Sequence, residues 1–81
     1  MSITSQQCRG ARAMLGLSQA DLEAASRVAK KSIADFEREA TKPQPRTLDA
    51  LKAALETAGV EFIAENGGGA GVRVRKTEPT A

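Results

Sequence analysis

Residues 17–43, with the sequence LSQADLEAASRVAKKSIADFEREATKP, contain two short helical patterns separated by a three-residue turn. Ser18 precedes the first pattern, and Asp21 lies three residues further on, which is the spacing of a capped helix start. We predict that the first helix ends near Ser26 and that the second covers residues 30–39. Helices this short are unstable alone in water, so the flanking segments must supply their packing partners.

A further helix is predicted on each side of this stretch, because apolar residues recur at spacings of three and four over residues 5–15 and about 46–58. A glycine directly follows each segment and is suited to end the helix. Ser5 is expected to cap the first helix. In the last helix, either Thr47 caps the start or Pro45 occupies the first helical position. The predicted core comprises Cys8, Ala11, Met14, Leu15, Leu22, Ala25, Val28, Ile33, Phe36, Leu48, Leu51, Ala54, Leu55 and Ala58.

The pattern then changes to that of a β-hairpin. Residues 60–63 and 72–75 are predicted to form two strands, joined by a glycine-rich turn at residues 65–71. This turn lacks the Gly-Lys-Ser/Thr ending of a phosphate-binding loop and precedes no helical pattern, so a hairpin loop is favoured. The predicted fold class is therefore mainly α: a four-helix domain over residues 1–59, a β-hairpin over residues 60–76 and a disordered tail over residues 77–81.

The hairpin suggests a contact between two copies of the chain. One hairpin is barely stable in water, and its open edges favour pairing with another strand. We predict that two hairpins join edge to edge in a four-stranded sheet, as the dimerisation element of a homodimer. The side chains expected in this interface are Phe62, Ile63, Val72 and Val74. The alternative is that the hairpin folds back onto the last helix of its own chain.

The composition is that of one small globular domain and excludes several classes of function. The 81 residues include 41% hydrophobic and 27% charged residues, unlike a disordered chain. There is no His and one Cys, so neither a zinc site nor a disulfide framework is expected. No nucleophile stands beside a base, which argues against an enzyme. We therefore expect no metal and no cofactor, and we interpret Cys8 as a small core side chain.

The chain carries no targeting signal that we recognise. The N-terminus lacks a basic segment followed by an apolar one, and no apolar run approaches about 20 residues. These features, together with the absence of paired cysteines, predict a cytoplasmic protein that does not contact membranes. The two aromatic residues, Phe36 and Phe62, are too few for the stacking platforms that bind single-stranded nucleic acid.

Basic residues gather in two clusters, although the net charge is only +2. Residues 27–46 contain six lysines and arginines against three acidic residues, and a second cluster comprises Arg73, Arg75 and Lys76. This distribution indicates a localised contact with a polyanion. The alternative from charge alone is a solvated surface.

The stretch resembles the Cro/CI-type helix-turn-helix family, also called the xenobiotic-response-element family of bacterial and phage regulators. The resemblance covers about residues 5–58, and the tail from Gly59 onward falls outside it. It implies a transcriptional regulator, with repression favoured, that binds double-stranded DNA and associates with the nucleoid when bound. Two copies would place their recognition helices in successive major grooves of an inverted repeat, about 34 Å apart. The matching residues are Arg12, Gly16, Leu17, Ser18, Gln19, Leu22, Val28, Ile33, Glu37, Arg38 and Pro43.

The resemblance implies base contacts at the start of the third helix. Its base-reading positions correspond to Lys30, Lys31 and Asp35. Lysines can donate to guanine O6 and N7, and a carboxylate can accept from cytosine N4. The alternative is that the lysines are merely exposed and that Asp35 pairs with Lys31, four residues away. With the positions that face the DNA backbone, the implied DNA-binding set is Gln19, Lys30, Lys31, Ser32, Asp35, Arg38 and Lys42.

The resemblance also implies supporting roles. Gln19 would contact a phosphate and support the third helix, and Arg38 and Lys42 would contact phosphates. Arg12 and Glu37 match a pair that ties the first helix to the end of the third.

Four residues depart from the family pattern. Arg27 stands in the turn where Gly is common, so it must adopt a left-handed backbone or a different turn. Ala29 stands where Ser or Thr often caps the third helix. Glu23 replaces a frequent Ala, and Glu39 a frequent Gly. We therefore expect the start of the third helix to differ locally from the family geometry.

A second function remains open from sequence. The hairpin could pair with a strand of another protein, as in an antitoxin-like or partner-controlled interaction module. Arg73 and Arg75 share one strand face, and the sequence does not decide whether they touch DNA or stay solvated.

Overall fold

The computed structural model describes residues 2–65 and 67–75. Within these residues the chain forms four helices and a two-stranded antiparallel sheet, which confirms the predicted fold class. The elements are α1 (Ser5–Leu15), α2 (Gln19–Ser26), α3 (Lys30–Glu37), α4 (Pro45–Ala58), β1 (Val60–Ile63) and β2 (Gly71–Val74). The tail predicted to be disordered lies outside the described residues.

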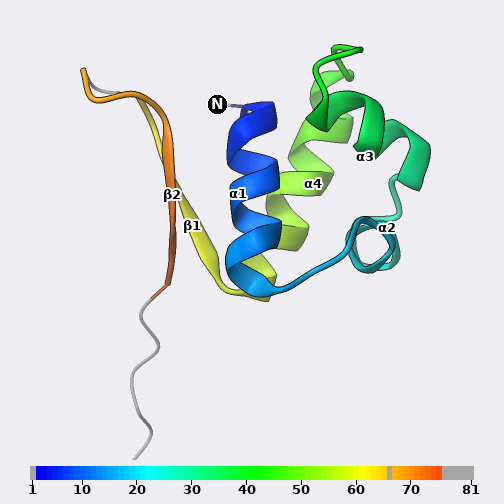
Figure 1. Ribbon diagram of the computed structural model, residues 1–81, viewed down its shortest axis with the longest axis horizontal. Helices are drawn as coiled ribbons and strands as arrows, with labels where there is room; N and C mark the ends of the chain where they lie inside the picture. The colour runs from blue at the N-terminus through cyan, green and yellow to red at the C-terminus, as the bar shows by residue number, and fades with distance from the viewer. Residues whose placement is uncertain (1, 66, 76–81) are drawn as a thin grey trace, which may run out of the picture.

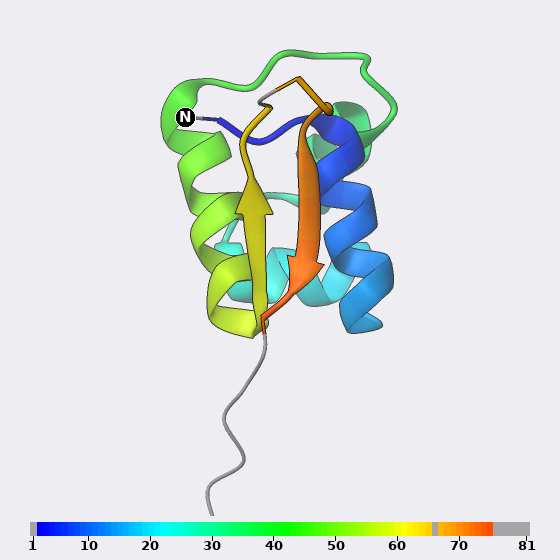
Figure 2. The ribbon, with the colours of Figure 1, turned by 90° about the vertical axis from the view of Figure 1, so that its left-hand side faces the viewer.

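The helices separate the hairpin from the helix-turn-helix pair. Figure 1 shows α1 and α4 in the middle of the molecule, with the hairpin against one side and α2 and α3 on the other. The hairpin and the pair α2–α3 therefore lie at opposite ends of the longest axis, which measures 43 Å. Figure 2 shows the hairpin face-on, with β1 over α4 and β2 over α1.

Helix starts follow capping chemistry, with one correction. Thr4, not Ser5, caps α1: its hydroxyl accepts from Gln7 N at 3.0 Å, and Gln7 Oε1 accepts from Thr4 N at 2.8 Å. This reciprocal pair needs Gln or Glu three residues after the cap, whereas the residue three after Ser5 is Cys8. The predicted Ser18–Asp21 box of α2 is confirmed, and α4 begins with Pro45 in its first turn.

The core lies between the four helices and β1, and it follows the predicted stripes with three exceptions. Met14 is 50% exposed, and Ala25 and Ala58 are also exposed. Helix α2 lies at the margin of the bundle, so among its residues only Leu22 is fully buried. Sequence reasoning missed Ile3, which is 3% exposed and stands just before the α1 cap, the position from which a hydrophobic staple packs onto a helix.

The hairpin packs on its own chain. Phe62 and Val72 face each other across the strands and lie against the core of the protomer. Gly10 lies beneath β2, where a β-carbon would lie 3.4 Å from Val72 Cγ1, at the short limit of ordinary van der Waals contact. The Gln7 side chain fixes the far end of the hairpin, donating to the carbonyl of Gly71 at 2.7 Å and to that of Ile63 at 3.3 Å. The hairpin thus folds back onto its own chain, where it covers α1 as well as α4.

Candidate nucleic-acid interface

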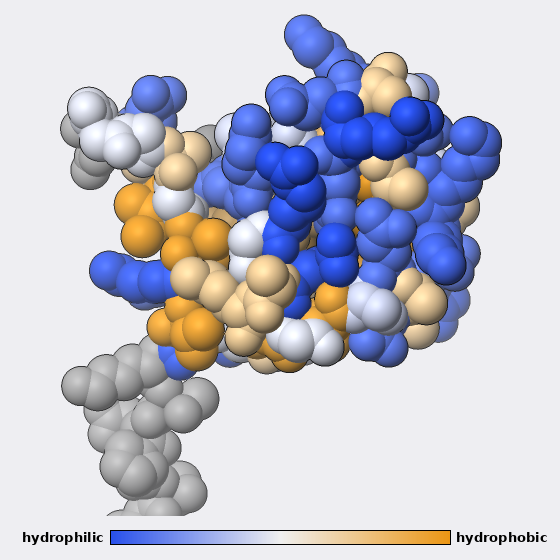
Figure 3. All heavy atoms as spheres, in the orientation of Figure 1, coloured by the Kyte–Doolittle hydropathy of each residue, from blue (hydrophilic) through white to orange (hydrophobic). Residues whose placement is uncertain are grey.

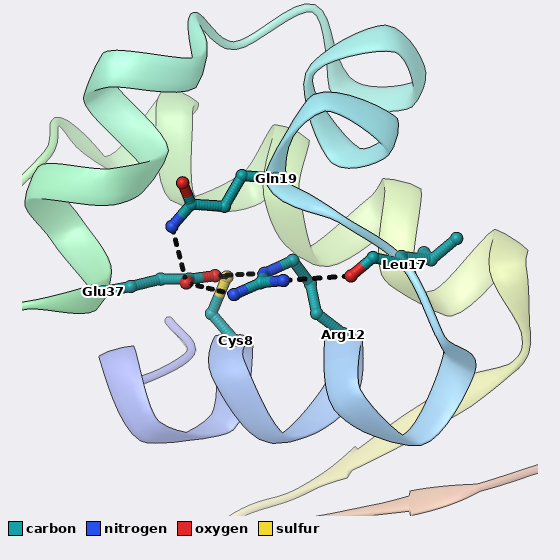
Figure 4. A network of polar contacts seen from close by, with 5 residues as sticks. All are labelled: Cys8, Arg12, Leu17, Gln19 and Glu37. Carbon is teal, nitrogen blue, oxygen red and sulfur yellow. Dashed lines mark hydrogen bonds and ion pairs between the residues drawn. The ribbon is translucent and has the colours of Figure 1, made fainter.

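A buried carboxylate joins the first three helices (Figure 4). Glu37, at the end of α3, is bound by Arg12 through two bonds of 2.6 and 2.7 Å. Gln19 Nε2 donates to the same carboxylate at 3.1 Å, and the Cys8 thiol donates at 3.3 Å. Arg12 also donates to the carbonyl of Leu17 in the α1–α2 connection at 2.9 Å. The predicted Arg12–Glu37 pair is therefore present as the centre of a larger network.

The network sets the protonation of its members. Burial acts to raise the pKa of Glu37, but the hydrogen bonds from Arg12, Gln19 and Cys8 outweigh burial and lower the pKa from its ordinary value of 4.5. Burial raises the pKa of Cys8 to about 12, with a further increase from its hydrogen bond to Glu37. The Cys8 thiol is fully buried and stays protonated, which is the behaviour of a core residue rather than a nucleophile.

The start of α3 presents the predicted base-reading residues to solvent. Lys30, Lys31 and Ser32 are all exposed in its first turn. Asp35 accepts from Lys31 Nζ at 3.3 Å and from Arg38 Nη2 at 2.8 Å, so the pairing named as the alternative is present in the DNA-free chain. Hydrogen bonds from Arg38 and Lys31 lower the pKa of Asp35. Asp35 therefore holds two cations along one side of α3.

The remaining predicted contacts surround α3. Arg38 follows its last residue, and Lys42 is exposed in the α3–α4 connection. Gln19 begins α2 and is half-buried, because its amide group donates to Glu37. This bond gives Gln19 the predicted supporting role beneath α3. Hydrophilic residues cover much of the α1 and α3 surface that faces the viewer in Figure 3.

The turn before α3 departs from the family pattern, and a side chain of α2 supplies the cap that the turn lacks. Arg27 adopts the left-handed backbone, with φ of 64°. Ala29 occupies the N-cap position and has no polar side chain. The carboxylate of Glu23 reaches over from α2 and accepts from Lys30 N at 3.1 Å. Glu23 thereby takes over the capping role that Ala29 cannot fill. The connection between these two departures from the family pattern was not evident from the sequence, because the residues are six positions apart. Glu39 is also left-handed, with φ of 61°.

The hairpin lies away from this surface. Arg73 forms an ion pair with Glu61 on the outer face of the sheet, and Arg75 is exposed. Both arginines belong to the end of the longest axis opposite α2 and α3 (Figure 1). Of the four residues predicted at a dimer interface, Phe62 and Val72 face the core of their own chain, Ile63 lies on the outer face, and Val74 is 55% exposed.

Two short helices joined by a tight turn, with an exposed second helix supported by a helical scaffold, define a helix-turn-helix DNA-binding domain. The chain belongs to the Cro/CI-type helix-turn-helix family, whose family model, described as helix-turn-helix, matches residues 9–62. The match includes most of β1 and thus extends beyond the segment that carried the sequence resemblance. No curated protein matches the chain. Membership shows sequence-specific DNA binding and transcriptional regulation, in a family that is not enzymatic.

Two kinds of feature are absent from residues 2–65 and 67–75. No helix there is long and apolar enough to cross a membrane. The same residues contain no cluster of His, Cys, Asp or Glu side chains that could hold a metal ion.

We expect Glu37→Gln to destabilise the fold by about 3 kcal/mol, because it leaves the Arg12 guanidinium, 19% exposed, without its charge partner. The effect should depend on pH. The pKa of Glu37 is lowered on folding, so its contribution is present above pH 4.5 and is lost as the pH falls through the folded pKa. Urea unfolding between pH 7 and pH 3 checks this prediction. The difference in free energy of unfolding between wild type and variant should decrease as the pH falls. A constant difference would contradict it.

We expect Glu23→Ala to cost about 1 kcal/mol in stability, because it removes the acceptor at the start of α3. Glu23→Gln, which keeps an acceptor oxygen, serves as the matched control and should stay near wild type. Adding Ala29→Ser to the Glu23→Ala variant should restore stability, because a serine at the N-cap can bond to the helix itself. Thermal unfolding of the four proteins decides it, and a failure of the serine to rescue would show that Glu23 acts in another way.

Proposed function

We propose that the chain is a repressor that binds an inverted-repeat operator as a homodimer and inserts α3 into the major groove. The exposed first turn of α3, with Lys30 and Lys31 adjacent, supports this proposal. The Glu37 network fixes α3 to α1 and α2, so the lysines start from a rigid support. A rigid support favours base reading because little ordering is required on binding.

In this proposal the basic side chains make two kinds of contact with DNA. Lys30 and Lys31 donate to base edges, while Arg38 and Lys42 contact phosphates and set the position of the domain on the duplex. Ser32 donates to a base edge or to the backbone beside them. Gln19 already donates one N–H of its side-chain amide to Glu37, so the second N–H and the backbone amides at the start of α2 are the groups that donate to the phosphate.

Asp35 has a conditional role in this proposal. In the free chain its oxygens are taken by Lys31 and Arg38. When Lys31 moves to a base and Arg38 to a phosphate, the Asp35 carboxylate is released and can accept from cytosine N4. Until then it holds both cations on one side of α3 and disfavours contact with DNA that offers no replacement partner.

The hairpin supports a dimer in which its outer face meets a second copy. Ile63 lies on that face beside the Glu61–Arg73 ion pair, and a two-fold axis that runs parallel to the strands and between them sets each acidic residue against a basic one of the second copy. The hairpin and α3 stand at opposite ends of the 43 Å axis, so hairpin-joined copies hold their recognition helices more than about 50 Å apart. This exceeds the 34 Å of one DNA turn and favours half-sites two turns apart.

We expect Lys31→Ala to lose about 1–3 kcal/mol of discrimination between operator and unrelated DNA. Fluorescence anisotropy on the DNA upstream of the chain's own gene, at two salt concentrations, measures it. Arg75→Ala removes the same charge at the opposite end of the molecule and is the matched control. Equal losses in both variants would mean that charge, not base reading, governs binding.

We expect DNA selected from a random pool to contain inverted half-sites with centres about 21 base pairs apart. Ile63→Asp should abolish this preference while leaving binding to one half-site intact, and light scattering should report a monomer. Selected half-sites only one turn apart would place the dimer contact closer to α3 and refute the hairpin interface.

A further inference from the structure

One edge of the hairpin carries backbone groups that point away from its partner strand. Arg75 N donates to Gly59 O at 2.7 Å, which sets the alternation of the ladder. Hydrogen-bonded and non-hydrogen-bonded pairs alternate along an antiparallel ladder, so Gly71 and Arg73 also direct their N–H and C=O toward β1. The N–H and C=O of Val72 and Val74 therefore point outward. In the part of the chain that the structure describes, the sheet consists of β1 and β2 alone, and β2 forms one of its edges.

The sheet is too narrow for the helices beneath it. Neighbouring strands lie about 4.8 Å apart, whereas packed helices lie about 8–10 Å apart and are themselves about 10 Å wide. β2 rests on α1, as the contact of Gly10 with Val72 and the bond from Gln7 to Gly71 show. β1 rests on α4 (Figure 2). It follows that α1 extends beyond the β2 edge and forms a shelf beside it.

This shelf is small and apolar where it meets β2. Gly10, Ala13 and Met14 share one side of α1, because they are separated by three and four positions, and the exposed residues Gln6 and Arg9 flank them toward the start of the helix. Met14 is 50% exposed and Val74 is 55% exposed, and among the described residues these are the exposed large hydrophobic side chains. Hydrophobic residues also gather on the hairpin end of the surface in Figure 3.

A second folded copy does not fit this edge. In antiparallel edge pairing, the symmetry axis passes about 2.4 Å from β2, halfway to the added strand. Figure 2 shows α1 reaching past the β2 edge, so in such a pair the two α1 helices would crowd each other across this axis. An isolated strand has no helix beneath it and meets no such obstacle. It would use the shelf in place of a helix of its own.

We propose that the β2 edge and the α1 shelf bind one extended segment of a partner protein. The segment pairs with the outward groups of Val72 and Val74 and turns every second side chain, an apolar one, toward Gly10 and Met14. The side chains between them face the same way as Arg73 and Arg75. Arg73 is already paired with Glu61, so acidic residues are favoured chiefly opposite the exposed Arg75. This inference is independent of DNA reading. It shares Arg73, on the outer face of the hairpin, with the dimer proposed above, whereas its backbone and apolar contacts use the β2 edge and α1.

Two synthetic peptides test the proposal on the full chain: seven residues alternating valine and glutamate, and the same peptide with lysine for glutamate. NMR titration of labelled protein should show the glutamate peptide shifting the amides of Val72, Val74 and residues 10–14. The lysine peptide should bind about tenfold more weakly, because it meets the arginines with like charge. Shifts confined to other residues, or no binding of the glutamate peptide at millimolar concentration, would overturn the proposal.

Val74→Pro provides the decisive variant. It removes an outward N–H while sparing the ladder to β1, and proline is tolerated on sheet edges. We expect about a tenfold loss of peptide affinity, whereas Val74→Ala, the matched control, keeps the backbone donor and much of the affinity. Equal thermal unfolding of the two variants establishes that both fold. Equal peptide binding by both, or a wild-type dimer that Val74→Pro converts to a monomer, would show that no partner strand uses this edge.

Discussion

The buried carboxylate of Glu37 is the constraint on which the arrangement of the helices depends. A buried charge without partners is strongly unfavourable, so α3 can dock only where Arg12 and Gln19 reach this carboxylate. Apolar packing of Ile33 and Phe36 supplies the cohesion of the helix pair, but it tolerates small shifts along the helix axis. The two short hydrogen bonds from the planar Arg12 guanidinium to Glu37 do not tolerate such shifts. The charge therefore specifies position, and the core supplies stability.

The turn before α3 contains two locally unfavourable residues, and contacts from α2 stabilise it. Arg27 in a left-handed backbone and Ala29 at the cap are each unfavourable when considered alone. Glu23 offsets the second by binding Lys30 N from the neighbouring helix, and Ser26 Oγ accepts from Val28 N at 3.2 Å within the turn. The start of α3, which carries the proposed base-reading residues Lys30 and Lys31, is therefore held by contacts from α2 and not by its own sequence.

The sequence was sufficient for features that depend on local spacing or that the family pattern supplies. Helical stripes, the Ser18–Asp21 box and the Arg12–Glu37 pair were all predicted, because each follows from a fixed separation or from the family pattern. Features that depend on contacts between distant segments, and that the family pattern does not supply, were not predicted. Gln7 reads as an ordinary helix residue, yet it binds the hairpin 56 and 64 positions away. Met14 fits the apolar stripe of α1, but its exposure is set by where the two-stranded sheet ends.

Helix α1 connects the two ends of the molecule, because opposite sides of it serve different partners. One side carries Arg12, which holds α3, and another carries Gln7 and Gly10, which hold the hairpin. A bound segment could alter DNA reading only by binding one position of α1 better than another, since a ligand shifts an equilibrium only by its differential affinity. Moving α1 would strain the buried Arg12–Glu37 pair, which costs far more than an edge strand contributes. Partner binding at β2 should therefore bring a second protein to the operator and leave the base-reading surface unchanged.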